Sequence, residues 1–238
     1  MRATLILTSA IKPSHDTPFL KHVDENLRLK ETLVCLKKWT KIIKQYNFNC
    51  VLVDNTFNDA DLRSKIPFAK FPEVQVLAAP PTNQHDLKKG TAFPELMSLK
   101  FAVNELGLAD NVLIIKSNAR YFIRNFSNLF NYVEKLIDVY FYTYLRFDRA
   151  ETKFFIITVQ HLKKFIEFAE LRVNVQDNIH LEHLFADYIS SNAYHASISF
   201  PIEPVISGIS GRTGDKYRFF NESWAHDQIS VIFRKFRR

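Results

Sequence analysis

The chain has 238 residues, of which 47% are hydrophobic and 24% are charged. This composition predicts a globular protein with a sizeable core and excludes an intrinsically disordered chain. Lys and Arg number 32 against 25 for Asp and Glu, and the resulting net charge of +7 favours an anionic partner. Such a partner is a phosphorylated ligand, an anionic membrane or a nucleic acid.

Cysteine use and hydropathy indicate a cytosolic protein. Cys35 and Cys50 are the two cysteines, and they form no Cys-x-x-Cys motif or Cys/His cluster. We therefore expect reduced thiols and no structural zinc site. The first apolar run meets Lys12 and Pro13 without a small-residue cleavage pattern, so it predicts a strand and not a signal peptide. No apolar run approaches the ~18 residues of a transmembrane helix.

Strand and helix patterns alternate along the first half of the chain. The predicted strands are residues 3–8, 50–53, 74–78 and 112–115, and the predicted helices are residues 26–46, 58–65 and 94–106. The second half is more mixed, with helices at 128–136, 160–171 and 180–190 and strands at 139–144 and 154–157. The alternation predicts an α/β fold with a mostly parallel, Rossmann-like sheet and helices on both faces.

The first candidate site residues follow the strands of this sheet. Right-handed crossovers place the carboxyl ends of the first, second and fourth strands at one edge, where open α/β sheets build ligand sites. Lys116, Asn118 and Arg120 follow the fourth strand, and the two cations favour an anionic ligand; solvated loop charges are the alternative. Asp54 and Asn55 end the second strand, where an acid or amide can bind a base or ribose. Asp-Asn is also typical of a turn.

Two glycine-containing segments are candidates for anion binding. Lys89-Gly90 precedes a helix, and a helix start with a nearby lysine favours an anion, although the pattern is not a P-loop. Residues 207–216 hold three of the five glycines of the chain. With Ser210 and Arg212, their backbone N–H groups suit a mobile loop that closes over a phosphate. A surface connection is the alternative.

The predicted helix at residues 180–190 carries the candidate base. Glu182 lies at the edge of its apolar face, where a carboxylate can deprotonate a hydroxyl, and an ordinary exposed glutamate is the alternative. Asp177, just before this helix, is the second candidate. His180 and His183 are three residues apart, but no third ligand is evident, so a metal site is rejected there.

The segments taken together resemble a known family. IIKSNARYFIRN is similar to a Lys-x-x-x-Arg-Tyr segment of bacterial GT-A-type glycosyltransferases, which are encoded with capsule and lipopolysaccharide pathways. TLILTSAIKPS resembles the first strand and loop of that family, VDNT the end of its second strand, and KGTAFPELMSLKFA its Lys-Gly-x-x-x-x-Glu helix start. LEHLFADYI resembles its acceptor-side helix and ISGISGRTGDKY its late glycine-rich loop. The family often has a further glycine where Thr91 to Pro94 stand here.

The resemblance implies a GT-A-like enzyme with a nucleotide-sugar donor and a saccharide or lipid-linked saccharide acceptor. Typical GT-A enzymes place an Asp-x-Asp metal site after the strand that corresponds to residues 112–115. This chain has Lys116 to Arg120 there, and its one Asp-x-Asp, at residues 59–61, is assigned to helix capping. No cofactor is therefore expected, because fixed cations can offset the diphosphate charge without a divalent metal.

This interpretation gives each candidate residue a role. Glu182 is the catalytic base, and a single base favours direct displacement with inversion of configuration. Tyr121 and His183 contact the acceptor, and no residue binds a metal. The donor is bound by residues at the strand ends and in the glycine segments: Thr8, Ser9, Asp54, Asn55, Lys89, Gly90, Lys116, Asn118, Arg120, Ser210, Gly211 and Arg212.

The chain is predicted to form one domain. Residues 1–125 are its nucleotide-sugar half, residues 126–221 its acceptor half, and residues 222–238 a basic amphipathic tail. The tail can dock on the inner face of an anionic cytoplasmic membrane, with packing on the domain as the alternative. Two other function classes stay open: a catalytically inactive homologue, and a basic nucleic-acid-binding module, against which the scattered basic residues argue.

Overall fold

The computed structural model describes residues 3–15, 17–133, 137–143 and 148–217. The predicted tail at residues 222–238 lies outside these ranges, so its contact with a membrane stays a prediction. Within the described ranges, no helix is both long enough and apolar enough to cross a bilayer.

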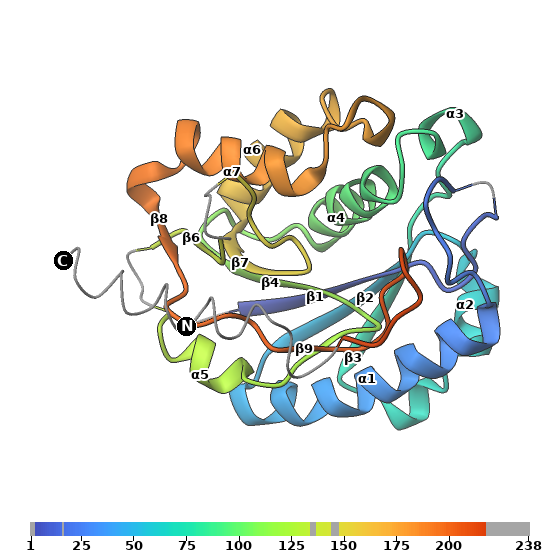
Figure 1. Ribbon diagram of the computed structural model, residues 1–238. Helices are drawn as coiled ribbons and strands as arrows, with labels where there is room; N and C mark the ends of the chain where they lie inside the picture. The colour runs from blue at the N-terminus through green and yellow to red at the C-terminus, as the bar shows by residue number, and fades with distance from the viewer. Residues whose placement is uncertain (1–2, 16, 134–136, 144–147, 218–238) are drawn as a thin grey trace.

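A seven-stranded sheet forms the middle layer of the molecule (Figure 1). Its first four strands in spatial order are parallel, and β7 pairs antiparallel with both β4 and β6. These parallel neighbours confirm the α/β fold with a mostly parallel sheet. The strands in spatial order are β3 (Val74–Ala78), β2 (Asn49–Asp54), β1 (Ala3–Ser9), β4 (Leu113–Asn118), β7 (Phe154–Thr158), β6 (Val139–Phe141) and β8 (Ser197–Ser199).

Helices cover both faces of this sheet (Figure 1). Side chains alternate along a strand, so Leu5 and Leu7 of β1 join the core under α1, whereas Ile6 joins the core under α4. One face is covered by α1 (Glu25–Tyr46), α2 (Asp59–Lys65) and α5 (Phe126–Phe130), and the other by α4 (Ala92–Leu106), α6 (Val159–Glu170) and α7 (Leu181–Asn192).

Side-chain caps explain where several helices begin. Asp24 accepts the backbone N–H of Leu27 at the start of α1, and Asn58 accepts that of Asp61 at the start of α2. The acid-rich start of α2 thus serves a helix end, as predicted from its Asp-x-Asp sequence. The predicted helix at residues 128–136 is replaced by the shorter α5, and residues 134–136 lie outside the described ranges.

Short elements without a clear sequence pattern complete the fold. They are α3 (Gln84–Leu87), the three 3₁₀ turns η1 (Phe68–Lys70), η2 (Val175–Asp177) and η3 (Tyr194–Ala196), and a small sheet of β5 (Phe122–Ile123) and β9 (Ile206–Ser207). Antiparallel pairing of β5 with β9 brings the glycine-rich loop at residues 207–216 beside the end of β4. This contact joins the late part of the chain to the centre of the sheet.

Candidate active site

A cleft of about 1300 Å³ opens at the carboxyl ends of β1, β2 and β4. The neighbours of β1 are β2 on one side and β4 on the other, and such a switch in strand order is where open α/β sheets form a ligand crevice. In register, Ser9 lies opposite Asp54, and Thr8 lies opposite Asn118. The three strand ends therefore meet at one edge, as the sequence predicted.

Most of the predicted site residues line this cleft. They come from four places: the strand ends, the turn after β4, the start of α7 and the glycine-rich loop. The residues brought together are Thr8, Ser9, Asn55, Asn118, Arg120, Tyr121, Glu182, His183, Ser210, Gly211 and Arg212. Four others, Asp54, Lys89, Gly90 and Lys116, are not among the lining residues.

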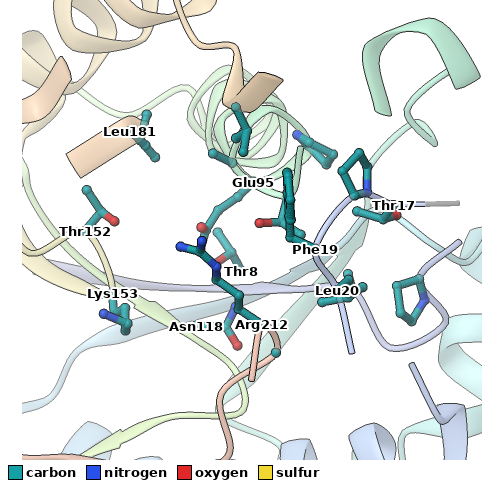
Figure 2. Close-up of a pocket in the computed structure, with 18 of the residues that line it drawn as sticks. Thr8, Thr17, Phe19, Leu20, Glu95, Asn118, Thr152, Lys153, Leu181 and Arg212 are labelled. Atoms are coloured by element: carbon teal, nitrogen blue, oxygen red, sulfur yellow. The ribbon is translucent and has the colours of Figure 1, made fainter. Parts of the chain in front are cut away.

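Figure 2 shows which residues form the floor and the two walls of the cleft. Thr8, Glu95, Asn118 and Arg212 lie in the middle of the view. One side carries Thr152, Lys153 and Leu181, and the other carries Thr17, Phe19 and Leu20 of the N-terminal loop. The cleft thus has a floor at the strand ends, a wall from the N-terminal loop and a wall beside α7.

The cleft is cationic. Its described lining has six Lys or Arg residues against three Asp or Glu residues, and His15, His180 and His183 add titratable nitrogens. The six cations are Lys12, Arg28, Arg120, Arg149, Lys153 and Arg212, and the three acids are Glu95, Asp148 and Glu182. This excess concentrates anionic ligands in the cleft.

Arg28 and Arg120 form a buried pair of like charges. Each is only 3% exposed. Arg28 donates to the carbonyls of Ala10 and His22, and Arg120 to the carboxylate of Glu31. Burial, and then the Arg120 charge, lower the pKa of Arg28 from its ordinary value to about 9. An anion bound beside the pair would offset both effects.

One N–H donor of the Arg28–Arg120 pair is not used in a hydrogen bond within the described part of the chain. The Nε atom of Arg120 is buried and has no hydrogen-bond partner among the described residues. Gly211 lies directly over the pair, since a Cβ atom there would stand 3.1 Å from a terminal nitrogen of Arg120. The Gly211 carbonyl accepts the N–H groups of Lys21 and His22, which ties the glycine-rich loop to the N-terminal loop. The sequence did not single out Arg28, because its burial is a tertiary effect.

Lys116 does not reach the cleft, and its expected contact with a donor diphosphate is corrected. The fourth strand was predicted to end at residue 115, but β4 continues to Asn118, so Lys116 lies inside it and faces α4. It is 1% exposed, and its Nζ atom lies 2.8 Å from Oε1 of Glu95. Nζ also donates to the carbonyl of Thr152 at 2.5 Å. The ammonium is therefore committed to partners inside the protein.

Glu95 is a site residue that the sequence reasoning missed. It lies in the first turn of α4, and its Oε1 accepts the Thr8 hydroxyl at 2.7 Å in addition to the Lys116 ammonium. Burial raises the pKa of Glu95, but the Lys116 charge and hydrogen bonds from Lys116, Thr8 and Asn118 outweigh it, so the pKa lies below its ordinary value. Glu95 is thus an ionised carboxylate in the cleft floor.

Asp54 and Gly90 have structural roles, which corrects their assignment to the donor, and Lys89 does not line the cleft. Asp54 is fully buried and accepts the backbone N–H groups of Ile11, Thr56 and Phe57, so it forms the turn that was the alternative interpretation. Lys89 pairs with Asp86 at 2.9 Å.

Gly90 has a φ of +93°, and a Cβ atom there would stand 2.5 Å from Val175. Only glycine fits this close approach between the α3–α4 turn and η2. Gly90 is therefore a packing residue.

The predicted base lies on the wall beside α7. Glu182 is half-buried, in the first turn of α7, and its carbonyl accepts the N–H of Ala150. The Nε–H of Arg149 donates to Nε2 of His183 at 2.8 Å. Burial lowers the pKa of His180, and Arg212 and Arg149 are among the charges that lower it further. Glu182 therefore stands among basic groups at the cleft surface.

Solved structures share this architecture. TarS of S. aureus, residues 1–349 in complex with UDP-GlcNAc, matches with a TM-score of 0.50 and 11% identity over 97% of this chain and 65% of that chain. The fold is GT-A-like. GlyE, a glycosyltransferase of Streptococcus pneumoniae TIGR4, matches with a TM-score of 0.48 and 10% identity over 99% of this chain and 63% of that chain. Neither a protein-family model nor a curated protein sequence matches the chain.

The likeness concerns the fold alone. The GT-A-like chain spans less than two thirds of the length of TarS and GlyE, and few residues are identical. A cytidylyltransferase of Leptospira borgpetersenii also matches, with a TM-score of 0.42 and 15% identity over 85% of this chain and 76% of that chain. A likeness of fold does not by itself determine function.

In the described ranges, no group of three or more His, Cys, Asp or Glu side chains is placed to hold a divalent metal ion. The Glu95 carboxylate, which accepts the Thr8 hydroxyl at the cleft floor, already pairs with the Lys116 ammonium. A metal ion beside Glu95 would be repelled by the positive charge of Lys116.

Proposed function

We propose that this chain is a glycosyltransferase that moves a sugar from a nucleotide-sugar donor to a saccharide acceptor. The observation that carries the proposal is the cationic cleft at the switch in strand order, with the buried Arg28–Arg120 pair beside it. A nucleotide-sugar is anionic at its diphosphate and rich in hydroxyls elsewhere. A cleft with guanidinium groups, hydroxyls and a carboxylate offers partners for both parts.

The donor diphosphate is assigned to the guanidinium groups. Arg120 has an unused Nε–H donor, Arg28 lies beside it, and Arg212 projects into the cleft from the glycine-rich loop (Figure 2). These charges would stabilise the negative charge that develops on the leaving diphosphate. The nucleoside would then lie over the ends of β1 and β2, near Asn55 and the N-terminal loop.

The acceptor is assigned to the wall beside α7. In an inverting transfer, the acceptor oxygen attacks the anomeric carbon and the bond from that carbon to the diphosphate oxygen breaks. Glu182 takes the proton from the attacking hydroxyl. His183 and Tyr121 would contact the acceptor. The basic groups around Glu182 favour polar ligands at this wall.

The biological setting rests on the resemblance of the sequence segments. It supports synthesis of a bacterial surface polysaccharide, such as capsule or lipopolysaccharide, by a metal-independent enzyme in the cytoplasm. The cleft supports metal independence because the Lys116 ammonium, in β4, already pairs with the Glu95 carboxylate.

A ligand screen tests the proposal. Thermal unfolding should be followed with a panel of nucleotide-sugars, beginning with UDP-GlcNAc, in excess EDTA. A ligand that binds only the native state raises the midpoint, by an amount set by its concentration relative to its dissociation constant. The ligand with the largest shift should then be hydrolysed slowly or transferred to a saccharide, still in EDTA. An absence of shifts across the panel would contradict the proposed donor class, and activity that needs added manganese would contradict metal independence.

Replacing Arg120 by Ala is expected to weaken donor binding by about 10–100-fold, because a hydrogen bond to a charged group contributes about 1.5–3 kcal/mol. Turnover should fall as well, since the leaving diphosphate gains charge in the transition state. Isothermal titration with nucleoside diphosphate measures the first effect and steady-state kinetics the second.

Arg63→Ala is the matched control, because Arg63 is exposed on α2 and does not line the cleft. If Arg120→Ala lowers the melting temperature but leaves binding and kinetics of the folded protein unchanged, then Arg120 is a structural residue that holds Glu31 and the Ile209 carbonyl.

A further inference from the structure

The Glu95 carboxylate has an unusual place for a site that binds a diphosphate. Its side chain is 24% exposed and lines the cleft, in the middle of a surface that otherwise favours anions. A phosphate group next to an ionised carboxylate is repelled. Glu95 must therefore face a part of the ligand that carries no negative charge.

The hydrogen bonds of Glu95 argue that it binds and does not transfer protons. An ionised carboxylate accepts about four hydrogen bonds. Thr8 and Lys116 donate to Oε1, and the Asn118 side chain donates to the carboxylate as well. These donors stabilise the ionised form, so the group is a poor proton acceptor in a reaction but a strong hydrogen-bond acceptor. The exposed part retains capacity for a ligand donor.

The position of Glu95 selects which ligand donor that is. In Figure 2 Glu95 lies between the N-terminal loop, with Phe19 and Leu20, and the wall with Thr152 and Leu181. Under the proposed function, the nucleoside belongs to the first side and the acceptor to the second. The group that stands between nucleoside and acceptor is the sugar being transferred.

We propose that Glu95 binds hydroxyl groups of the transferred sugar and thereby helps to select the donor. Lys116 is a positioning residue in this scheme: it is buried behind Glu95 and fixes the carboxylate without contact to the ligand. This inference rests on the proposed glycosyltransferase function, and it gives the Lys116–Glu95 pair a role that replaces direct diphosphate binding by Lys116.

Titration of two ligands tests the inference. The wild-type chain and Glu95→Gln should be titrated with the nucleotide-sugar that gives the largest thermal shift and with its nucleoside diphosphate. Glu95→Gln exchanges a charged acceptor for a neutral one, so affinity for the nucleotide-sugar should fall about tenfold. Affinity for the nucleoside diphosphate should stay unchanged or rise, because a negative charge near the phosphates is removed.

Glu105→Gln is the matched control, since Glu105 is exposed at the other end of the same helix. Equal losses for both ligands would place the ribose at Glu95 and overturn the assignment to the transferred sugar. Unchanged affinity for both ligands would overturn it as well. A wild-type chain that binds no nucleotide-sugar is a different result, since it removes the proposed function on which the inference rests. Circular dichroism before titration establishes that each variant is folded.

Discussion

Replacing Glu182 by Gln is expected to lower turnover by about 10²–10⁴-fold, the usual cost of removing a general base. The amide has nearly the shape of the carboxylate but cannot take the proton of the acceptor hydroxyl. Donor affinity should hardly change, because the proposed role of Glu182 is to take the proton of the acceptor hydroxyl, whereas the diphosphate is assigned to Arg28, Arg120 and Arg212. Initial rates at saturating donor, together with titration of the donor alone, separate these two effects.

Glu167→Gln is the control for this variant, since Glu167 is exposed on α6 and does not line the cleft. Turnover of Glu182→Gln within about threefold of the wild type would be far below the effect of a lost base and would contradict the assignment. Asp148 is then the next residue to change, because it lines the same cleft, whereas Asp177, the alternative from sequence, does not.

Sequence patterns predicted the frame of the site well. Short apolar runs, helical spacing of apolar residues and helix-cap residues predicted β1, β2, β3 and β4 with the helices between them. The rule that parallel strands end at one edge then brought these strand ends together: Thr8 lies opposite Asn118 in register, and the Asn55 N–H donates to the Ser9 carbonyl. The late glycine-rich loop joined them through β5–β9 pairing, which the sequence alone did not indicate.

Sequence patterns could not predict which charged groups face each other inside the protein. A strand boundary three residues too early placed Lys116 in a loop, whereas the real β4 turns it into the protein toward α4. Glu95 lies in the segment that resembles the family's helix start but had no predicted role, since its partner is 21 positions away in sequence and one layer away in space. In the sequence, Arg28 resembles the other cations of a basic helix, and its burial is seen only in the structure. These are tertiary contacts, and no local pattern encodes them.

Lys116→Met is expected to destabilise the protein by about 3 kcal/mol, near the lower end of the cost of breaking a buried ion pair. The side chain is almost fully buried, so its loss leaves Glu95 charged without its ammonium and leaves the Thr152 carbonyl without its donor. The lower end applies because Glu95 is partly exposed and water can solvate it. For a chain of this length, such a loss lowers the melting temperature by about 6–12 °C.

The double variant Lys116→Met with Glu95→Gln separates charge from packing. It should recover more than half of the stability lost in Lys116→Met, because no uncompensated carboxylate remains, while the unpaired Thr152 carbonyl keeps it below the wild type. Lys100→Met is the matched control: Lys100 pairs with Glu170 at 2.7 Å from the exposed surface of α4, and such pairs contribute about 0–1 kcal/mol. Denaturant unfolding of the wild type, Lys116→Met, Glu95→Gln and the double variant gives the coupling energy between the two side chains directly. Simple addition of the two single losses would mean that Lys116 and Glu95 do not act as a pair.

Titration of Lys116→Met with nucleoside diphosphate tests whether Lys116 binds the phosphates. Unchanged affinity is expected from a lysine that stands behind Glu95, whereas a loss as large as that of Arg120→Ala would return Lys116 to the phosphate site.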